Sequence, residues 1–194
     1  PDKDAKLIDL KKHITEKINH PINKDNKKMI IFTSFSDTAE YLYENISEWL
    51  LQEHGLYTGI VTGSSGTKTN LKTVSNQFEA ILAHFSPKSN HLRTDIEQID
   101  VLIATDCISE GQNLQDCDYL INYDIHWNPV RIVQRFGRID RIGSKNKVIQ
   151  LVNFWPNIEL DEYINLEDRV RNRMVMLDLS ATGDDDLLSS ESKN

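Results

Sequence analysis

Short apolar runs alternate along this chain with longer stretches whose apolar residues recur every three or four positions. The runs are typical of buried strands, and the stretches are typical of helices that present one face to a core. We therefore expect strands at residues 29–35, 57–61, 99–106, 118–124 and 148–154, and helices at 38–54, 74–85 and 127–138.

The run IDVLIATD at residues 99–106 is the strongest strand signal in the sequence. Because it is almost continuously apolar, it is typical of the middle of a parallel sheet that is covered on both faces. The alternation of strands and helices predicts an α/β fold, with an open, mostly parallel sheet and helices on both faces. In such sheets ligands bind at the carboxyl ends of the strands.

Length and composition limit the possible functions. The 194 residues, 39% hydrophobic, suffice for one sizeable core, and no apolar run approaches the ~20 residues of a membrane-spanning helix. Cys107 and Cys117 lack the spacing of a zinc site, so we expect no metal site, and free thiols suit a cytoplasmic protein. The net charge of −8 means that contact with nucleic acid requires a local basic patch.

The stretch TGSSGTKT at residues 62–69 invites comparison with a phosphate-binding P-loop, GxxxxGK[ST]. Gly63 lies five positions before Lys68 instead of six, and Thr67 instead of glycine precedes the lysine. We therefore expect a plain turn that leads from a strand into a helix.

Two segments carry candidate chemistry. In ATDCISEGQNL, residues 104–114, polar groups follow directly on the strongest strand, where an open sheet binds ligands, although a plain strand-to-loop junction has the same pattern. In QRFGRIDRIG, Gln134, Arg138 and Arg141 share a face if the helix continues, and an apolar face forms separately. Residues 131–147 contain six Lys or Arg and one acidic residue. Such clustered cations suit a transferring phosphoryl group or nucleic-acid phosphates.

The segments IIFTSF, VLIATDCISEGQNLQDCDYLINYD and NPVRIVQRFGRIDRIG resemble, in this order, motifs IV, V and VI of the second RecA-like lobe of superfamily 2 helicases. The resemblance is closest to the Swi/Snf-like group, except that Ser144 stands where that group commonly has glutamine. It implies a RecA-like, three-layer α/β/α fold and the second motor lobe of an ATP-dependent nucleic-acid translocase.

The resemblance also implies roles for individual residues. Arg138 and Arg141 match the arginine fingers that reach ATP held by the other lobe, and Gln134 matches a glutamine at the lobe interface. The remaining matches fall into two groups. Asp106, Glu110 and Gly111 belong to the nucleotide side, and the nucleic-acid side comprises Ser34, Phe35, Thr62, Gly63, Ser64, Thr105, Ser109 and Asn113.

The lysine and acidic pair that bind ATP and Mg²⁺ in such enzymes belong to the first lobe, and no matching segment occurs in the 194 residues. We therefore expect this chain to be inactive alone and to hold no nucleotide tightly. Its expected partners are the first lobe of a longer parent, also suggested by the start at Pro1, and nucleic acid, with double-stranded DNA favoured. No membrane partner is expected.

The resemblance leads to a division into four parts. They are an N-terminal helical or linker segment at 1–27, the RecA-like lobe at 28–155, a helix at 156–180 and an acidic, disordered tail at 181–194. Two alternatives stay open. One is a binding module without catalysis, and the other is an independent α/β hydrolase, for which His126 is the best candidate base.

Overall fold

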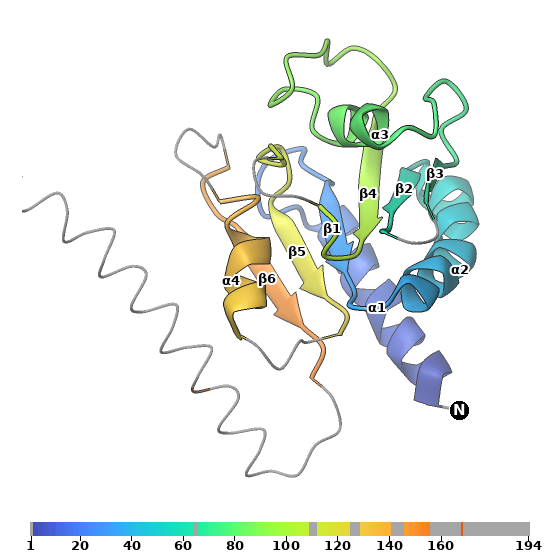
Figure 1. The fold of residues 1–194 in the computed structure, drawn as a ribbon, viewed down its shortest axis with the longest axis vertical. Helices are drawn as coiled ribbons and strands as arrows, with labels where there is room; N and C mark the ends of the chain where they lie inside the picture. Colours follow the sequence, from blue (N-terminus) through green and yellow to red (C-terminus); the bar gives the residue numbers. More distant parts are fainter. Residues whose placement is uncertain are drawn as a thin grey trace, which may run out of the picture.

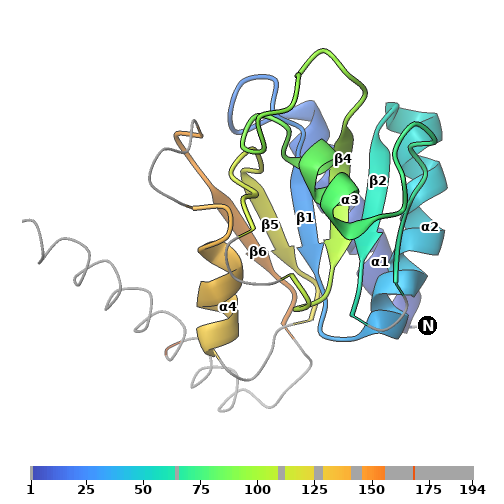
Figure 2. The ribbon, with the colours of Figure 1, turned by 45° about the horizontal axis from the view of Figure 1, so that its top comes forward.

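The computed structural model describes residues 2–63, 66–108, 112–124, 129–140, 146–155 and 168. These residues form one six-stranded sheet with helices on both faces (Figures 1 and 2). The helices are α1 (Asp2–Asn19), α2 (Ser36–His54), α3 (Phe78–Phe85) and α4 (Pro129–Phe136). The strands are β1 (Met29–Phe32), β2 (Tyr57–Val61), β3 (Thr67–Thr69), β4 (Ile99–Ala104), β5 (Tyr119–Asn122) and β6 (Gln150–Asn153).

The sheet has the strand order β3-β2-β4-β1-β5-β6, with β1 at its centre. β1 pairs in parallel with β4 on one side and with β5 on the other, while β3 alone runs antiparallel among the described strands. The chain therefore passes from β4 to β5 across β1, and the carboxyl ends of the parallel strands meet at one edge, the lower edge in Figure 2. The predicted open, mostly parallel α/β fold is confirmed.

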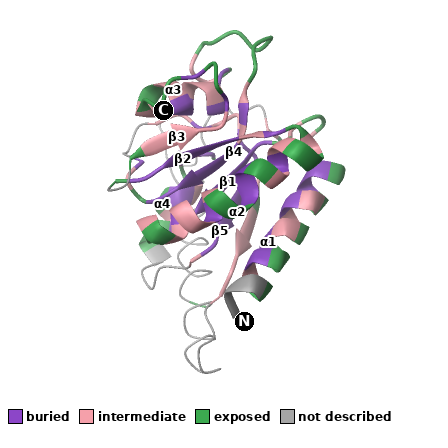
Figure 3. Cartoon of the chain, turned by 90° about the vertical axis from the view of Figure 1, so that its right-hand side faces the viewer, coloured by how far each residue is buried: buried purple, intermediate pink, exposed green. Residues whose placement is uncertain are grey.

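Two apolar cores lie on opposite faces of the sheet. Side chains alternate along β1, so Met29 and Ile31 join the core under α1 and α2, while Ile30 and Phe32 join the core that contains α3. Figure 2 shows α3 and α4 in front of the sheet and α1 and α2 behind it. Figure 3 shows that the sheet-facing sides of α1 and α2 are buried. The predicted three layers are therefore present.

The N-terminal helix belongs to the same core as the sheet. Leu10 and Ile14 of α1 are fully buried, and they pack in the cluster that contains β1, α2 and β5. Residues 2–19, which the sequence assigned to a separate segment, thus form part of the layer behind the sheet.

The predicted apolar stripe of α2 faces the core, with Leu42, Ile46 and Leu50 fully buried. Its start differs from the expected one. The helix begins at Ser36 instead of residue 38, and Phe35 at the cap position makes no side-chain cap hydrogen bond. At the other end, Gly55 adopts the left-handed conformation, φ 66°, that favours glycine and ends helices.

The loop after β2 is a second difference. We expected residues 62–69 to lead into a helix, but β3 turns back and pairs antiparallel with β2, so the loop is the turn of a hairpin. The helix expected from residue 74 begins only at Phe78. Gly59 explains why α3 packs so closely on β2, because a Cβ atom there would lie 2.9 Å from Cγ2 of Ile81.

In the described part of the chain, no helix is both long enough and apolar enough to span a membrane. The helix predicted at 156–180 and the tail predicted at 181–194 lie outside the described residues, apart from Asp168, which is in a helical conformation.

Candidate nucleotide and nucleic-acid site

Asp106 is the central acceptor at the carboxyl edge of the sheet. It follows β4 by two residues, and both of its carboxylate oxygens accept hydrogen bonds from Arg135 of α4, from Nε at 2.7 Å and from Nη2 at 2.9 Å. Arg131, one turn earlier on α4, donates Nη1 to the same carboxylate at 2.9 Å. This paired, bidentate arrangement is the strongest type of arginine–carboxylate contact.

The guanidinium of Arg135 lies inside the protein. The residue is only 1% exposed, and its Nη1 also donates to Oδ1 of Asn122 at 3.0 Å and to the backbone oxygen of Asp124 at 3.4 Å. Its guanidinium carbon stands 5.1 Å from the centre of the Phe32 ring. One arginine therefore joins α4 to the ends of β1, β4 and β5, so that α4 is held over the carboxyl edge.

The charge state of Asp106 follows from these contacts. Partial burial raises the pKa of its carboxyl group, but the hydrogen bonds and positive charges of Arg135 and Arg131 outweigh burial and lower the pKa below its usual value. Asp106 is therefore ionised at neutral pH, and it neutralises a cation that would otherwise be buried without a partner.

Asp124 forms a second cluster at the same edge. Its carboxylate accepts a hydrogen bond at 2.5 Å from Oγ1 of Thr33, which lies just after β1. It also forms an ion pair at 3.1 Å with Nζ of Lys6 on α1. The Lys6 ammonium also lies 4.0 Å from the centre of the Tyr123 ring. The edge is thus supported from both faces of the sheet, by α4 in front and by α1 behind.

The predicted arginine face of α4 is only partly formed. The helix ends at Phe136, and a turn closes it through hydrogen bonds from Arg138 N to Arg135 O and from Asp140 N to Phe136 O. Gln134 is exposed and Arg138 is half-buried, whereas Arg135 is buried. The prediction that Gln134, Arg138 and Arg141 share one face required the helix to continue through these residues. The helix instead ends before Arg138.

Several predicted nucleic-acid residues meet at the carboxyl edge. The backbone N–H of Thr105 donates to Val61 O, and a Cβ atom on Gly63 would lie 3.5 Å from Cβ of Cys107, so the turn after β2 lies against the segment after β4. Thr62 Oγ1 donates to Gly66 O at 3.0 Å and closes that turn.

Motif IV contributes two further residues to this edge. Ser34 is half-buried, and Phe35 is 65% exposed, which is unusual for a large aromatic side chain.

Asn113 lies elsewhere. Its amide nitrogen donates to Ser89 O at 3.3 Å, and it lines a hollow with Lys28 and Asp100, which precede or begin β1 and β4. It is therefore at the amino edge of the sheet, away from Asp106. Five other predicted site residues and the candidate base lie outside the described residues: Ser64, Ser109, Glu110, Gly111, Arg141 and His126.

The structural role of Arg135, a buried arginine that binds Asp106, was not predicted from the sequence. The signal was present, because Arg135 follows Ile132 by three positions and precedes Ile139 by four, and both isoleucines are fully buried. An arginine on the inward face of a helix requires a buried carboxylate. Asp106, at the end of the best strand, was the natural candidate.

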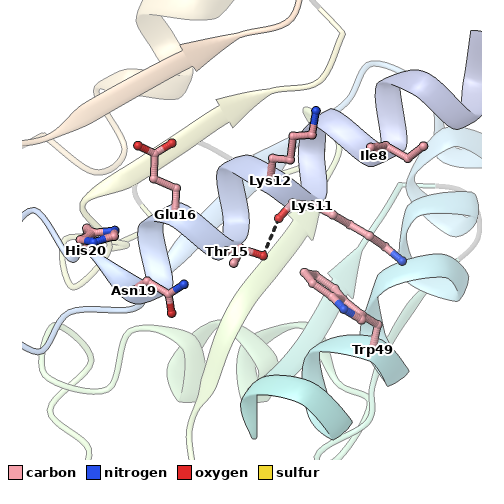
Figure 4. Close-up of a pocket in the computed structure, with 8 residues that line it drawn as sticks. All are labelled: Ile8, Lys11, Lys12, Thr15, Glu16, Asn19, His20 and Trp49. Atoms are coloured by element: carbon pink, nitrogen blue, oxygen red, sulfur yellow. Dashed lines mark hydrogen bonds between the residues drawn. The ribbon is translucent and has the colours of Figure 1, made fainter.

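A separate groove runs between α1 and α2, behind the sheet (Figure 4). It has a volume of about 560 Å³ and is lined by residues that include Ile8, Lys12 and Trp49, with the Lys11 ammonium 4.9 Å from the centre of a Trp49 ring. None of the predicted site residues that the structure describes lines this groove.

Comparisons with known proteins identify the family and support the fold. The family described as helicase conserved C-terminal domain matches residues 5–143. An uncharacterized ATP-dependent helicase of Bacillus subtilis, YqhH, is 35% identical over 144 residues, which are 74% of this chain and 21% of YqhH. The ATP-dependent RNA helicase RhlB of a Shewanella species is 25% identical over 173 residues, 83% of this chain and 35% of RhlB.

Among solved structures, domain 2 of the DEAD-box helicase Mss116p bound to an RNA duplex has the same fold, with a TM-score of 0.59 and 18% identity over 84% of this chain and 55% of that chain. The fold is therefore that of the second RecA-like lobe of superfamily 2 helicases. The chain belongs to the helicase conserved C-terminal domain family. It spans between a fifth and about a third of the two curated relatives.

Proposed function

We propose that this chain is the second motor lobe of an ATP-dependent nucleic-acid translocase of the Swi/Snf-like group, with double-stranded DNA as its track. In this proposal ATP and Mg²⁺ are held by a first lobe that this chain does not contain. Arg138 and Arg141 enter that site from this lobe and stabilise the negative charge that develops on the transferring phosphoryl group. Gln134 contributes to the interface between the lobes.

The observation that carries the proposal is the position of α4. Arg135 is bound from within by Asp106 and Asn122, so α4 is held at the edge where open α/β sheets bind ligands. Gln134 is exposed on α4, and Arg138 is half-buried in the turn that follows the helix. In the proposal both residues meet the first lobe at this edge. Preorganised cations of this kind cost no reorganisation at the moment of reaction.

The nucleic-acid track is proposed to cross the same edge. Ser34, Phe35, Thr62 and Gly63 lie at this edge, where the turn after β2 lies against Thr105. In the proposal their short polar groups contact phosphates without reading bases. Alternating closure on ATP and opening after hydrolysis then move the lobes along the strand. The free thiols Cys107 and Cys117 are compatible with the proposed cytoplasmic setting.

The test is Arg138→Ala in the two-lobe parent. We expect hydrolysis to fall by about 10³-fold or more, the typical contribution of an arginine finger, while ATP binding stays largely intact. ATPase rate and nucleotide affinity are measured separately. Arg93→Ala is the matched control, because Arg93 lies on the surface and pairs only with Asp95 in the described structure.

An unchanged turnover number in Arg138→Ala would contradict the proposed role of Arg138 as an arginine finger. If the parent hydrolyses no ATP at all, with or without nucleic acid, the alternative of a binding module without catalysis takes its place.

A further inference from the structure

A second hollow, of about 1120 Å³, opens at the amino edge of the sheet, opposite to the edge that carries Asp106. We call it the amino-edge basin. It is lined by residues 22–28 before β1, by residues between 88 and 100 that lead into β4, by 113, 115 and 116 before β5, and by 146–148 before β6. In Figure 2 the loops before β1 and β4 form the upper edge of the molecule.

Three asparagine side chains fix the walls of the basin. Asn26 donates to Asp116 O at 2.9 Å and to Asn146 Oδ1 at 3.0 Å. Asn146 donates to Gln115 O at 2.9 Å, and Asn23 donates to Val148 O at 2.7 Å. The bonds of Asn26 and Asn23 connect residues that are 90 to 125 positions apart in sequence, and the bond from Asn146 to Gln115 spans 31 positions. The tertiary fold therefore brings the walls of the basin together.

The basin is basic in a protein that is acidic overall. Five lysines line it, against three aspartates and one histidine. Asp116 already accepts hydrogen bonds from the backbone N–H groups of Lys88 and Ser89 and from the Ser89 hydroxyl. The lysines are Lys24, Lys27, Lys28, Lys88 and Lys147.

Four of these lysines are exposed at the rim: Lys24, Lys27, Lys88 and Lys147. No carboxylate of the described residues lies within ion-pair distance of their ammonium groups, whereas Lys6, Lys17 and Lys68 each have such a partner. The rim therefore presents positive charge that the described part of the fold does not neutralise by contact.

Lys28 has a different role, at the floor of the basin. Its Nζ donates to Ile99 O at 2.9 Å, and burial lowers the pKa of its ammonium group despite the nearby Asp100. The attraction for an anion thus comes from the rim lysines. Two residues of the lining, Asp25 (φ 60°) and His91 (φ 59°), are held in left-handed backbone conformations, which only a constrained loop maintains in residues other than glycine.

The lining determines the class of ligand. Small-molecule sites are mostly apolar, whereas this lining is dominated by lysines, amides and carboxylates, with Ile22 and Val148 as its apolar members. Among the described residues of the lining there is no phenylalanine, tyrosine or tryptophan, so these residues offer no platform for stacked bases. Lysines spread along an open trough suit successive phosphates instead.

We propose that the amino-edge basin binds the sugar–phosphate backbone of a nucleic-acid strand, without sequence preference. This contact is separate from the track proposed at the carboxyl edge and does not depend on the role of Arg138. The proposed contact also explains how Asn113 can bind nucleic acid, although it lies in the basin lining, away from the other predicted nucleic-acid residues.

The test compares two double variants of the 194-residue chain. Lys88→Gln with Lys147→Gln removes two rim lysines from different segments of the lining, and Lys12→Gln with Lys72→Gln removes two exposed lysines outside the basin. Affinity for single-stranded DNA, RNA and duplex DNA is measured by fluorescence anisotropy at several salt concentrations. Thermal unfolding confirms that each variant is folded.

We expect the basin variant to lose affinity on the order of tenfold for all sequences, and the slope of log K against log[salt] to become shallower by about 1.4 to 1.8, the value for two lost phosphate contacts. The control should leave the slope unchanged. Equal affinity and slope in the basin variant and the unmodified chain, or an equal loss in the control, overturns the proposal.

A positional measurement complements the affinities. Bound nucleic acid should protect Lys88 and Lys147 from acylation of their amines, and leave Lys12 and Lys72 reactive, as read by mass spectrometry. Equal reactivity of Lys88 and Lys147 with and without nucleic acid contradicts the proposed contact, even where Arg138→Ala has confirmed the motor function.

Discussion

Arginines that are neighbours in sequence have opposite roles at this site. Arg135 is 1% exposed and is bound by Asp106, Asn122 and the backbone of Asp124, whereas Arg138 is half-buried in the turn that follows α4. A buried guanidinium is stable only where its charge and donors are satisfied. Arg135 is therefore a positioning residue, and its partner Asp106 stabilises the fold and the placement of α4.

We expect Asp106→Asn to destabilise the fold by about 2–3 kcal/mol, because it leaves the buried Arg135 charge without its carboxylate. The effect is below that of a fully buried pair, since the Asp106 side chain is 24% exposed. Urea unfolding measures it. Asp95→Asn, which breaks the exposed pair with Arg93, is the control and should leave stability unchanged.

The pH dependence of stability provides a second readout for the same pair. Because the pKa of Asp106 is lowered in the folded state, its stabilising contribution is fully present above the unfolded pKa of about 3.9 and is lost as pH falls through the folded pKa. The difference in unfolding free energy between the unmodified chain and Asp106→Asn should therefore shrink only below about pH 4. A difference that is constant from pH 7 to pH 3 contradicts the ion-pair explanation.

At the scale of elements, a buried ion pair ties α1 to the sheet. Lys17 Nζ lies 2.6 Å from Asp118 Oδ1 with both side chains inaccessible to solvent, and Asn23 donates to the other oxygen of Asp118 at 2.8 Å. Asp118 immediately precedes β5, and Asn23 also binds the residue Val148, just before β6. The helix before β1 is thereby connected to the two strands at the far side of the sheet.

We expect Lys17→Met to cost about 3–5 kcal/mol, because Asp118 is left as a buried charge without a cation. Adding Asp118→Asn removes that charge and should recover part of the loss, so the double variant should be more stable than Lys17→Met alone. Chemical unfolding of both variants completes the comparison. The control Lys68→Met breaks the partly exposed pair with Glu40 and should cost less than about 1 kcal/mol.

If the double variant is no more stable than Lys17→Met, the loss comes from packing of the lysine stem in place of the charge. The attachment of α1 would then rest on its buried residues Leu10 and Ile14.

At the scale of the whole molecule, the two edges of the sheet differ in construction. The carboxyl edge combines a tightly bonded interior around Asp106 with exposed Phe35 and Gln134, while the amino edge is an open basic trough. Under the proposed function, the carboxyl edge is half of a site that a first lobe completes.

We therefore expect no ATP hydrolysis by this chain alone, and hydrolysis stimulated by nucleic acid in a protein extended upstream through the first lobe. Rates with duplex DNA, single-stranded DNA and RNA identify the track, and double-stranded DNA should stimulate most. Arginine fingers contribute only when a nucleotide is held opposite them. Stimulation by RNA alone would contradict the proposed track, and hydrolysis by the isolated lobe would contradict the two-lobe mechanism.

The sequence by itself determined the α/β class, most strand positions and the family, because apolar periodicity is local and the motif segments around residues 99–124 and 128–143 are contiguous. It did not reveal the hairpin after β2, since the pairing of β3 with β2 depends on where the chain turns back. It also missed the burial of Arg135. That position is decided by Asp106, just after β4, and by Asn122, at the end of β5.

The tertiary structure also decided that Asn113 lies at the amino edge of the sheet, opposite to Asp106. Asn113 lies only seven positions after Asp106 in sequence, yet the loop between β4 and β5 carries the chain from one edge of the sheet to the other, because parallel strands must start from the same side. Local sequence thus determined which residues can carry charge or bind phosphate. Only the crossover connections of the sheet decided which of them meet at the edge with Asp106 and which line the amino-edge basin.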